Sequence, residues 1–283
     1  MNRVALITGG SKGLGAHLVR RFWLQGYSLV AIARDFADLH SVLNDLPFRG
    51  DQIAKPMVCD LADVFKVDSL LSSIKETVNH LDVLVNNAAI QGPIGSLCEN
   101  DLLAWQQTLQ VNLLAPVALC KGLIPLMKRP DGASIINLSG GGATGPRANF
   151  SAYATAKAGL VRFSETIAEE LKGEDIRVNC IAPGAMKTAM LQEVLSKGDS
   201  AGEREVALAS EIFAKGSASM DRVADLALFL ASDASKGISG KLISAVWDNW
   251  EQWPLHLDKL SKSDVYTLRR ISGRDRGFEW GDK

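Results

Sequence analysis

The chain has 283 residues, of which 47% are hydrophobic, so its length allows one large domain or at most two. Its 31 basic and 32 acidic side chains nearly balance, which argues against nucleic acid or an anionic membrane as a partner. No apolar run approaches the roughly 20 residues that are expected to span a bilayer. The apolar run at the N-terminus is about five residues, too short for the core of a signal peptide.

The cysteines and histidines predict a chain without disulfides or a metal site. The four cysteines, at positions 59, 98, 120 and 180, are far apart and form no C-x-x-C pair. The four histidines show no spacing typical of metal ligands. We therefore expect reduced thiols, a cytoplasmic location and no bound metal.

Short apolar runs alternate with longer amphipathic ones along the chain. The runs that indicate buried strands are 3–8, 28–33, 53–60, 81–86, 133–139, 176–182 and 241–247. Near-continuous apolar strands separated by helices predict one α/β domain, with a doubly wound parallel sheet of about seven strands and helices on both faces. The polar segment at about 187–219 is weakly helical and is predicted to form a mobile substrate lid.

The first predicted strand leads into a glycine-rich turn, "TGGSKGLG" (8–15), which opens the first helix. Glycines at 9, 13 and 15 allow a sharp turn and a close approach of the backbone to a ligand. Free N–H groups at a helix start favour a phosphate. The glycines alone also fit a plain tight turn, but the strand–turn–helix context favours a dinucleotide site.

This turn and the later motifs together resemble the short-chain dehydrogenase/reductase family. The turn has the family's T-G-x-x-x-G-x-G spacing, and Tyr153 and Lys157 form its Y-x-x-x-K pair. The other matches, in chain order, are Asp60-Leu61, "NNAA" (86–89), Asn112, "APG" (182–184) followed by Thr188, and the helix and turn at 218–240. The resemblance covers about residues 3 to 246 and implies a single-domain Rossmann fold.

The same resemblance implies a nicotinamide dinucleotide as cofactor. Asp60 and Leu61 would bracket the adenine, and Asn87 would touch the adenosine side. Met186 and Thr188 would hold the nicotinamide amide. Alternatively, Asp60 only ends a strand and Thr188 only caps a helix. The residues implied in cofactor binding are Gly9, Ser11, Lys12, Gly13, Leu14, Gly15, Arg34, Asp60, Leu61, Asn87, Tyr153, Lys157, Pro183, Gly184, Met186 and Thr188.

The end of the second strand decides between NAD and NADP. Ala33 stands where the family places an acidic residue for NAD, and Arg34 follows it. A basic side chain here pairs with the 2′-phosphate of NADP, and Lys12 would add a second charge, unless both are only surface charges. Asp35 has the generic NAD spacing, but we interpret it as the cap of the next helix. NADP(H) is therefore expected over NAD(H).

Tyr153 is the candidate general acid for reduction of a carbonyl, and the base in the reverse direction. A free tyrosine has a pKa near 10, so a pKa near 7 requires about 4 kcal/mol of preferential stabilisation of the phenolate. Lys157 lies one helical turn further on the same face and would supply that field. The resemblance adds that Lys157 holds the nicotinamide ribose. Asn112 would support a water that links Lys157 to solvent, unless it only makes a local hydrogen bond.

The family's usual serine, 13 residues before the tyrosine, is replaced by Gly140, and Ser139 comes one residue earlier. If the loop up to Asn149 holds one inserted residue, Ser139 moves into register, and the glycine run makes such a shift sterically cheap. Ser139 is the predicted second donor to the carbonyl oxygen. The alternatives are a glycine N–H, Ser151 or Asn149.

The segment 247–283 departs from the family, whose members end soon after the last strand. Four of the six tryptophans lie in it. It is predicted to pack on its own core or on a neighbouring subunit, or else to form a flap that grips substrate with aromatic side chains and Arg269–Arg270. We therefore divide the chain into a Rossmann-type domain (1–246) and a C-terminal extension (247–283). A homodimer or homotetramer is expected from the family.

These patterns predict an NADP-preferring oxidoreductase that interconverts a secondary alcohol and a ketone, with Tyr153, Lys157, Ser139 and Asn112 as its catalytic residues. One alternative is a dinucleotide-binding sensor or scaffold without turnover, and another is a family member of altered chemistry. An extended-branch epimerase or dehydratase is disfavoured, since that branch has T-G-x-x-G-x-x-G and a longer C-terminal domain. The substrate is not indicated by any motif.

Overall fold

A seven-stranded parallel sheet forms the centre of the computed structural model, which describes residues 2–280. The strand order is β3-β2-β1-β4-β5-β6-β7. The strands are β1 (Val4–Thr8), β2 (Ser28–Ala33), β3 (Ala54–Val58), β4 (Val83–Asn86), β5 (Ala133–Leu138), β6 (Ile176–Ala182) and β7 (Leu242–Ser244). All seven predicted strands are confirmed, although β7 is shorter than expected. Residue 1 of the predicted Rossmann-type domain (1–246) and residues 281–283 of the predicted C-terminal extension (247–283) lie outside the described residues.

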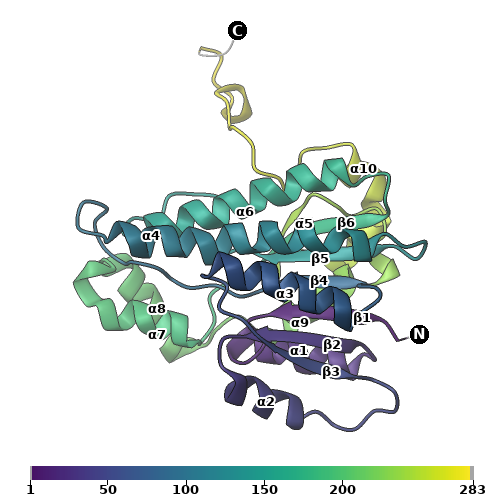
Figure 1. Cartoon of the computed structure of the whole chain (residues 1–283). Coiled ribbons are helices and arrows are strands. Elements are labelled where there is room, and N and C mark those ends of the chain that lie inside the picture. Colours follow the sequence, from purple (N-terminus) through teal and green to yellow (C-terminus); the bar gives the residue numbers. More distant parts are fainter. Residues whose placement is uncertain (1, 281–283) are drawn as a thin grey trace.

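Helices cover both faces of the sheet, as predicted (Figure 1). One face carries α3 (Val64–Thr77), α5 (Ala115–Met127) and α6 (Ser151–Glu170), and the other carries α1 (Gly13–Leu24), α2 (Phe36–Asn44) and α9 (Met220–Leu230). Side chains alternate along each strand, so that Leu6 packs on the first face and Ile7 on the second, both fully buried. The predicted doubly wound α/β fold is therefore observed.

The helix α4 (Leu102–Leu109) continues through a π-helical turn (Gln110–Leu114) into α5. The most apolar 18 residues of the combined helix, Leu102–Met127, have a mean hydropathy of 1.5, so the helix is long and apolar enough to span a bilayer by length and composition alone. The expectation that no apolar run reaches this length was therefore wrong. The helix is apolar because α5 buries Leu119 and Leu123 against the sheet. A core helix of this kind passes the same test of length and composition.

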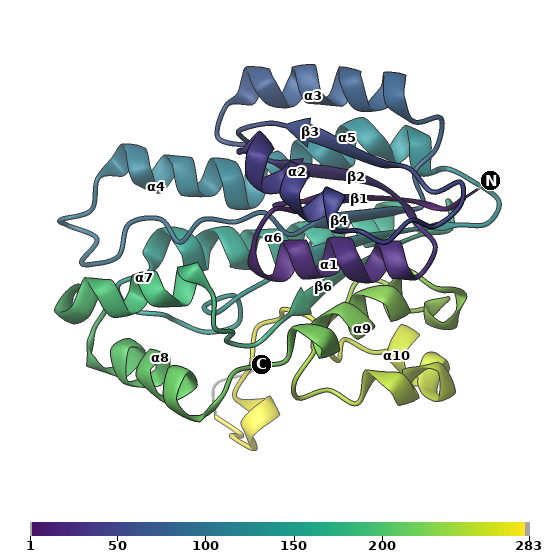
Figure 2. The same cartoon turned by 90° about the horizontal axis from the view of Figure 1, so that it is seen from below.

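The segment predicted as a lid forms two ordered helices, α7 (Ala189–Lys197) and α8 (Glu203–Lys215), beside the carboxyl ends of the strands (Figure 2). Each helix is amphipathic and buries its apolar side, with Val194 and Ala209 almost fully enclosed. Thr188 and Gly202 precede the two helices, and the Thr188 hydroxyl accepts a bond from Leu191 N at 3.4 Å. The two helices thus form a separate flap next to the sheet.

The C-terminal extension begins by packing on the chain's own core. Trp250 and Trp253 are each 5% exposed, and both belong to the core cluster of α1 and α9. The extension then runs along β7, where Leu242 N donates to Tyr266 O at 2.8 Å and so extends the hydrogen bonding of the sheet edge. Its last part, with the short turn Arg274–Arg276, projects away from the body (Figure 1).

Candidate active site

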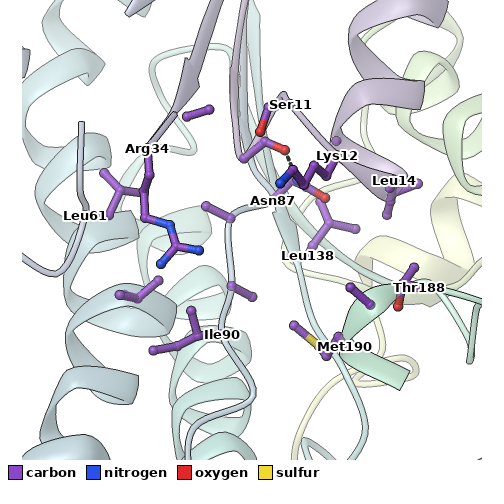
Figure 3. Close-up of a pocket in the computed structure, with 18 of the residues that line it drawn as sticks. Ser11, Lys12, Leu14, Arg34, Leu61, Asn87, Ile90, Leu138, Thr188 and Met190 are labelled. Carbon is purple, nitrogen blue, oxygen red and sulfur yellow. Dashed lines mark hydrogen bonds between the residues drawn. The ribbon is translucent and has the colours of Figure 1, made fainter. Parts of the chain in front are cut away.

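A cavity of about 370 Å³ opens at the carboxyl ends of β1, β2, β4 and β5. This is the edge at which open parallel sheets bind nucleotides, because the strand order reverses there. Figure 3 shows the cavity with Arg34 and Leu61 at one end and Thr188 and Met190 at the other. The predicted site residues that line it are Gly9, Ser11, Lys12, Gly13, Leu14, Gly15, Arg34, Asp60, Leu61, Asn87, Ser139, Tyr153, Lys157, Pro183, Met186 and Thr188.

The glycine-rich turn lines this cavity in a backbone conformation that disfavours side chains at its glycines. A Cβ atom on Gly15 would lie 1.9 Å from the Gly9 carbonyl oxygen. Gly9 and Gly13 have φ values of +68° and +51°, in the left-handed region that disfavours side chains. The turn therefore leaves backbone N–H groups at the start of α1 open to a ligand. This cradle fits a dinucleotide pyrophosphate.

Asn87 fixes the glycine turn to the end of β4. Its amide nitrogen donates to Thr8 O at 2.9 Å, and the Thr8 hydroxyl accepts from the backbone N–H of Asn87 and of Ala88, both at 3.0 Å. Asn87 lines the cavity as predicted, and its observed contacts hold the shape of the turn. The predicted contact with the adenosine side stays a prediction.

Arg34 lies exposed at the mouth of the cavity. The other predicted cation, Lys12, is paired with Asp38 at 2.7 Å, and this partner raises the Lys12 pKa. Asp35 accepts a bond from Asp38 N at 2.8 Å, so its predicted role as the cap of α2 is confirmed. Of the two cations predicted to meet a 2′-phosphate, Lys12 is therefore held by Asp38 and Arg34 is not.

Three further cofactor positions have clear structural contacts. Asp60 lies two residues beyond β3 and accepts a bond from Ala62 N at 3.1 Å. Thr188 caps α7, which is the plainer role weighed for it above. Gly184 does not line the cavity. Its φ is +77°, and an added Cβ would lie 2.7 Å from Val246 Cγ2, so this glycine is required by packing against the end of β7.

Tyr153 and Lys157 project from the same side of α6 to the inner end of the cavity. The Lys157 ammonium lies 5.7 Å from the centre of the Tyr153 ring and donates to Leu138 O at 2.7 Å. Burial lowers the pKa of Lys157 to about 8. Burial also raises the pKa of Tyr153, while the positive charge of Arg147 opposes this rise. The removal of the Tyr153 phenol from water thus outweighs the positive charge near it.

Gly140 is the residue that faces the Tyr153 hydroxyl. A Cβ on Gly140 would lie 2.4 Å from that oxygen, so the phenol occupies the space that a side chain at position 140 would fill. Ser139 continues β5 through a bond from its N–H to Ile181 O at 2.8 Å. Ser139 lines the cavity, and its hydroxyl is buried without a hydrogen-bond partner among residues 2–280. Buried hydroxyls usually have a partner, so Ser139 is a candidate donor to a ligand.

Asn112 lies in the π-helical turn and does not line the cavity. Its side-chain amide donates to Ile90 O at 2.8 Å and accepts from Ile90 N at 2.9 Å. Both polar atoms of the side chain therefore hold the loop after β4, which is the local role considered in the sequence. The predicted water between Asn112 and Lys157 stays a prediction. π-helical turns often occur at functional sites.

Several cavity residues carry no signal in the sequence. Gln107 on α4 and Met190 on α7 line the cavity but belong to segments without a recognisable motif. Arg147, in the loop before α6, does not line the cavity but lies behind Tyr153, where it stacks on Phe150 with its guanidinium carbon 3.7 Å from the ring centre. These residues reach the site through packing between distant segments, which a local pattern does not report.

The fold and this cavity define a dinucleotide-binding protein of the Rossmann type. The family model described as short chain dehydrogenase matches residues 3–199. The chain belongs to this family of oxidoreductases.

Proteins of known name are similar over most of their length. The chain is 30% identical over 246 residues to the 3-oxoacyl-[acyl-carrier-protein] reductase FabG of Thermotoga maritima, covering 85% of this chain and 95% of that protein. It is 28% identical over 242 residues to "Dehydrogenase/reductase SDR family member 4" of Pongo abelii, covering 86% and 85%. A solved RhlG/NADP active-site complex from Pseudomonas aeruginosa has a TM-score of 0.74 at 27% identity, covering 86% and 94%.

Proposed function

We propose that this oxidoreductase interconverts a secondary alcohol and a ketone with NADP(H), using Tyr153 as general acid and base. The observation that carries the proposal is the position of Tyr153 and Lys157, one helical turn apart, at the inner end of the nucleotide cavity. A proton donor at this point can reach a carbonyl oxygen held against the cofactor. The names of the relatives, which include a reductase and a dehydrogenase, support the reaction class.

The proposed mechanism assigns one task to each side chain. When bound, the reduced nicotinamide supplies the hydride. The Tyr153 hydroxyl donates a proton to the carbonyl oxygen as charge develops there, and the Lys157 ammonium stabilises the phenolate that remains. The unpaired Ser139 hydroxyl donates a hydrogen bond to the same oxygen and so orients the carbonyl. The water through which the proton of Tyr153 is restored would lie between Lys157 and Asn112, whose own side chain is held by Ile90.

The preference for NADP(H) is proposed from the charge at the adenosine end. Arg34 is exposed at the cavity mouth, where a 2′-phosphate would lie, and no acidic side chain takes the position of Ala33. The RhlG structure in complex with NADP supports the same choice by similarity.

A homo-oligomer is also proposed, either a dimer or a tetramer. Only 39% of the most apolar 18-residue stretch of the helix Leu102–Met127 is buried, and Leu103 and Leu114 are 74% and 50% exposed. A second copy would cover such side chains. A cytoplasmic location is likewise a proposal, supported by four cysteines that are unpaired in the described chain.

A second function, dinucleotide binding without turnover, is favoured by one observation. Gly140 leaves the catalytic loop without the side chain that the family usually carries opposite the tyrosine. The two functions separate in one experiment, in which the purified chain is mixed with NADPH and a panel of ketones. The proposed enzyme oxidises NADPH and forms the secondary alcohol with at least one ketone. Tight NADPH binding with no oxidation across the panel would instead establish the binding protein.

A further inference from the structure

One ion pair ties the lid to the loop that leads into α6, the helix of Tyr153 and Lys157. Arg147 lies between β5 and α6, and Glu205 lies in the first turn of α8. Nε and Nη2 of Arg147 donate to one carboxylate oxygen of Glu205 at 2.9 and 2.7 Å. The two side chains are only 16% and 18% exposed. No other Lys or Arg pair with a carboxylate within residues 2–280 has both partners below one fifth exposed.

Arg147 also contacts the aromatic side chains next to the reacting hydroxyl. Its guanidinium carbon lies 3.7 Å from the ring centre of Phe150 and 5.8 Å from that of Tyr153. Phe150 is fully buried and immediately precedes α6, and its carbonyl accepts from Ala154 N at 2.9 Å. A stacked guanidinium has a fixed position relative to the rings. The orientation of Arg147 and that of Tyr153 are therefore linked.

The glycine run beneath Arg147 makes this contact possible. Gly142 has φ +90°, and an added Cβ would lie 2.6 Å from Ala154 Cβ and 3.3 Å from Arg147 Cβ. A Cβ on Gly141 would lie 3.7 Å from Arg147 Cδ. A side chain at position 142 would therefore force the loop away from α6, whereas a Cβ at position 141 would make only ordinary contact with Arg147. Gly142 thus allows the loop to lie close to α6 beneath Arg147.

The lid closes on the same aromatic side chains. Val194 of α7 and Ala209 of α8 belong to one buried cluster with Ile94, Phe150 and Tyr153. These contacts are apolar and not directional, whereas the ion pair is directional and poorly screened by solvent. The ion pair therefore fixes where the lid stops relative to the tyrosine.

We propose that Arg147 is a positioning residue, which couples the lid to Tyr153 through its ion pair with Glu205. The pair holds α8 closed over the site, and the guanidinium orients the phenol and adds positive charge beside it. The inference rests on the proposed function of Tyr153 as acid and base. It assigns a role to Arg147 and Glu205 that the Y-x-x-x-K pair does not contain.

Few charged groups face the Tyr153 ring. Lys157 lies on α6, Arg147 lies on the preceding loop, and Glu205 of α8 faces the ring only through Arg147. The lid helix α7 and Ile94 contribute apolar side chains to this cluster. Since Arg147 lowers the pKa of Tyr153, neutralising Arg147 should raise it, and removing the counter-charge of Glu205 should lower it.

The test compares Arg147→Met with Glu205→Gln. In ketone reduction the proton donor must be protonated, so turnover falls with pH as Tyr153 loses its proton. This limb of the pH profile should move to higher pH in Arg147→Met and to lower pH in Glu205→Gln. A merely structural pair would move the limb in the same direction in both variants, or not at all, and that result would overturn the proposed coupling.

A second measurement does not depend on turnover. Backbone amide exchange in α8 (203–215) should be about tenfold faster in each single variant than in the wild type, and the double variant should add little further. Exchange in α9 (220–230) should not change. The matched control is the exposed pair Arg222–Glu251, at 2.7 Å and 41% and 44% exposed. Arg222→Met and Glu251→Gln should leave the exchange of α8 and the pH limb unchanged.

The outcomes separate the two proposals. If the wild type turns over no ketone, the proposed function fails, and the exchange of α8 still decides whether the ion pair holds the lid. If the wild type is active but α8 exchanges at the wild-type rate in both single variants, the inference about Arg147 fails and the proposed function stands.

Discussion

The two ends of the cavity are built in different ways. The dinucleotide end is made of backbone, in which glycines at 9, 13 and 15 bring the turn close to the ligand and Asn87 ties it to β4. The substrate end is lined by side chains from distant segments, such as Gln107, Tyr153 and Met190. Behind Tyr153, Arg147 pairs with Glu205, which lies 58 residues further along the chain. The first end depends on steric exclusion within a short stretch. The second depends on contacts that exist only after folding.

The largest expected effect breaks the dinucleotide end. In Gly15→Ala the added Cβ would lie 1.9 Å from the Gly9 carbonyl oxygen, so the turn must rearrange. We expect NADPH affinity to fall by at least about a hundredfold, measured by fluorescence titration, while circular dichroism stays that of a folded chain. Gly173→Ala is the control, since an added Cβ there meets nothing within 4 Å. Equal affinities in both variants would contradict the proposed cradle.

The next effect concerns the substrate end. Ser139→Ala removes the unpaired hydroxyl that lines the cavity, and turnover should fall by about 10²-fold without a change in NADPH affinity. Ser134 provides a matched control, because it lies on β5, the strand that Ser139 directly follows, and its hydroxyl is also buried without a partner in the described chain. Unchanged turnover in Ser139→Ala would remove Ser139 from the mechanism.

A smaller effect tests the charge at the adenosine end. Arg34→Asp should lower the ratio of kcat/KM for NADPH over NADH by at least about tenfold, because an acidic side chain repels the 2′-phosphate and accepts a bond from the 2′-hydroxyl. Lys55→Asp makes the same charge change at an exposed position on the neighbouring strand β3. A ratio that moves equally in both variants would reduce Arg34 to a general surface charge.

The smallest effect is a pH dependence of stability. Burial lowers the pKa of Lys157 from 10.5 to about 8. Between these values the unfolded chain still holds a proton that the folded chain has lost, so this group makes stability rise with pH there. The free energy of unfolding of Lys157→Met should therefore exceed that of the wild type by most below pH 8. The difference between the two should shrink as the pH rises toward 10.5. Denaturant titration across this window measures it, and a constant difference would contradict the low pKa.

The contrast between the two ends of the cavity explains which structural features the sequence can predict. All seven strands and the cap formed by Asp35 follow from local patterns, namely apolar runs and short-range bonding. The bonds of Asn112 to Ile90 and the ion pair of Arg147 with Glu205 do not, because each joins residues far apart in the chain. The contact of Tyr266 with β7 is of the same kind.

The segment 139–157, which joins the end of β5 to the first part of α6, lies between these cases. The sequence locates Tyr153 and Lys157 from their spacing, and the resemblance identifies Gly140 as the position of the missing serine. The sequence does not indicate that the Tyr153 phenol fills the space left by Gly140, since this depends on how α6 packs against the end of β5. Spacing along one helix is thus predictable, whereas the contact across the cavity is a result of packing.

Proton transfer through Tyr153 is tested most directly by the turnover of Tyr153→Phe. The variant keeps the ring and removes only the oxygen that would exchange the proton. We predict a loss in kcat of at least about 10³-fold with NADPH and a ketone that the wild type reduces, and an unchanged affinity for NADPH. Tyr266→Phe, in the C-terminal extension, should keep wild-type turnover. Reduction by Tyr153→Phe at a rate within about tenfold of the wild type would contradict the assignment.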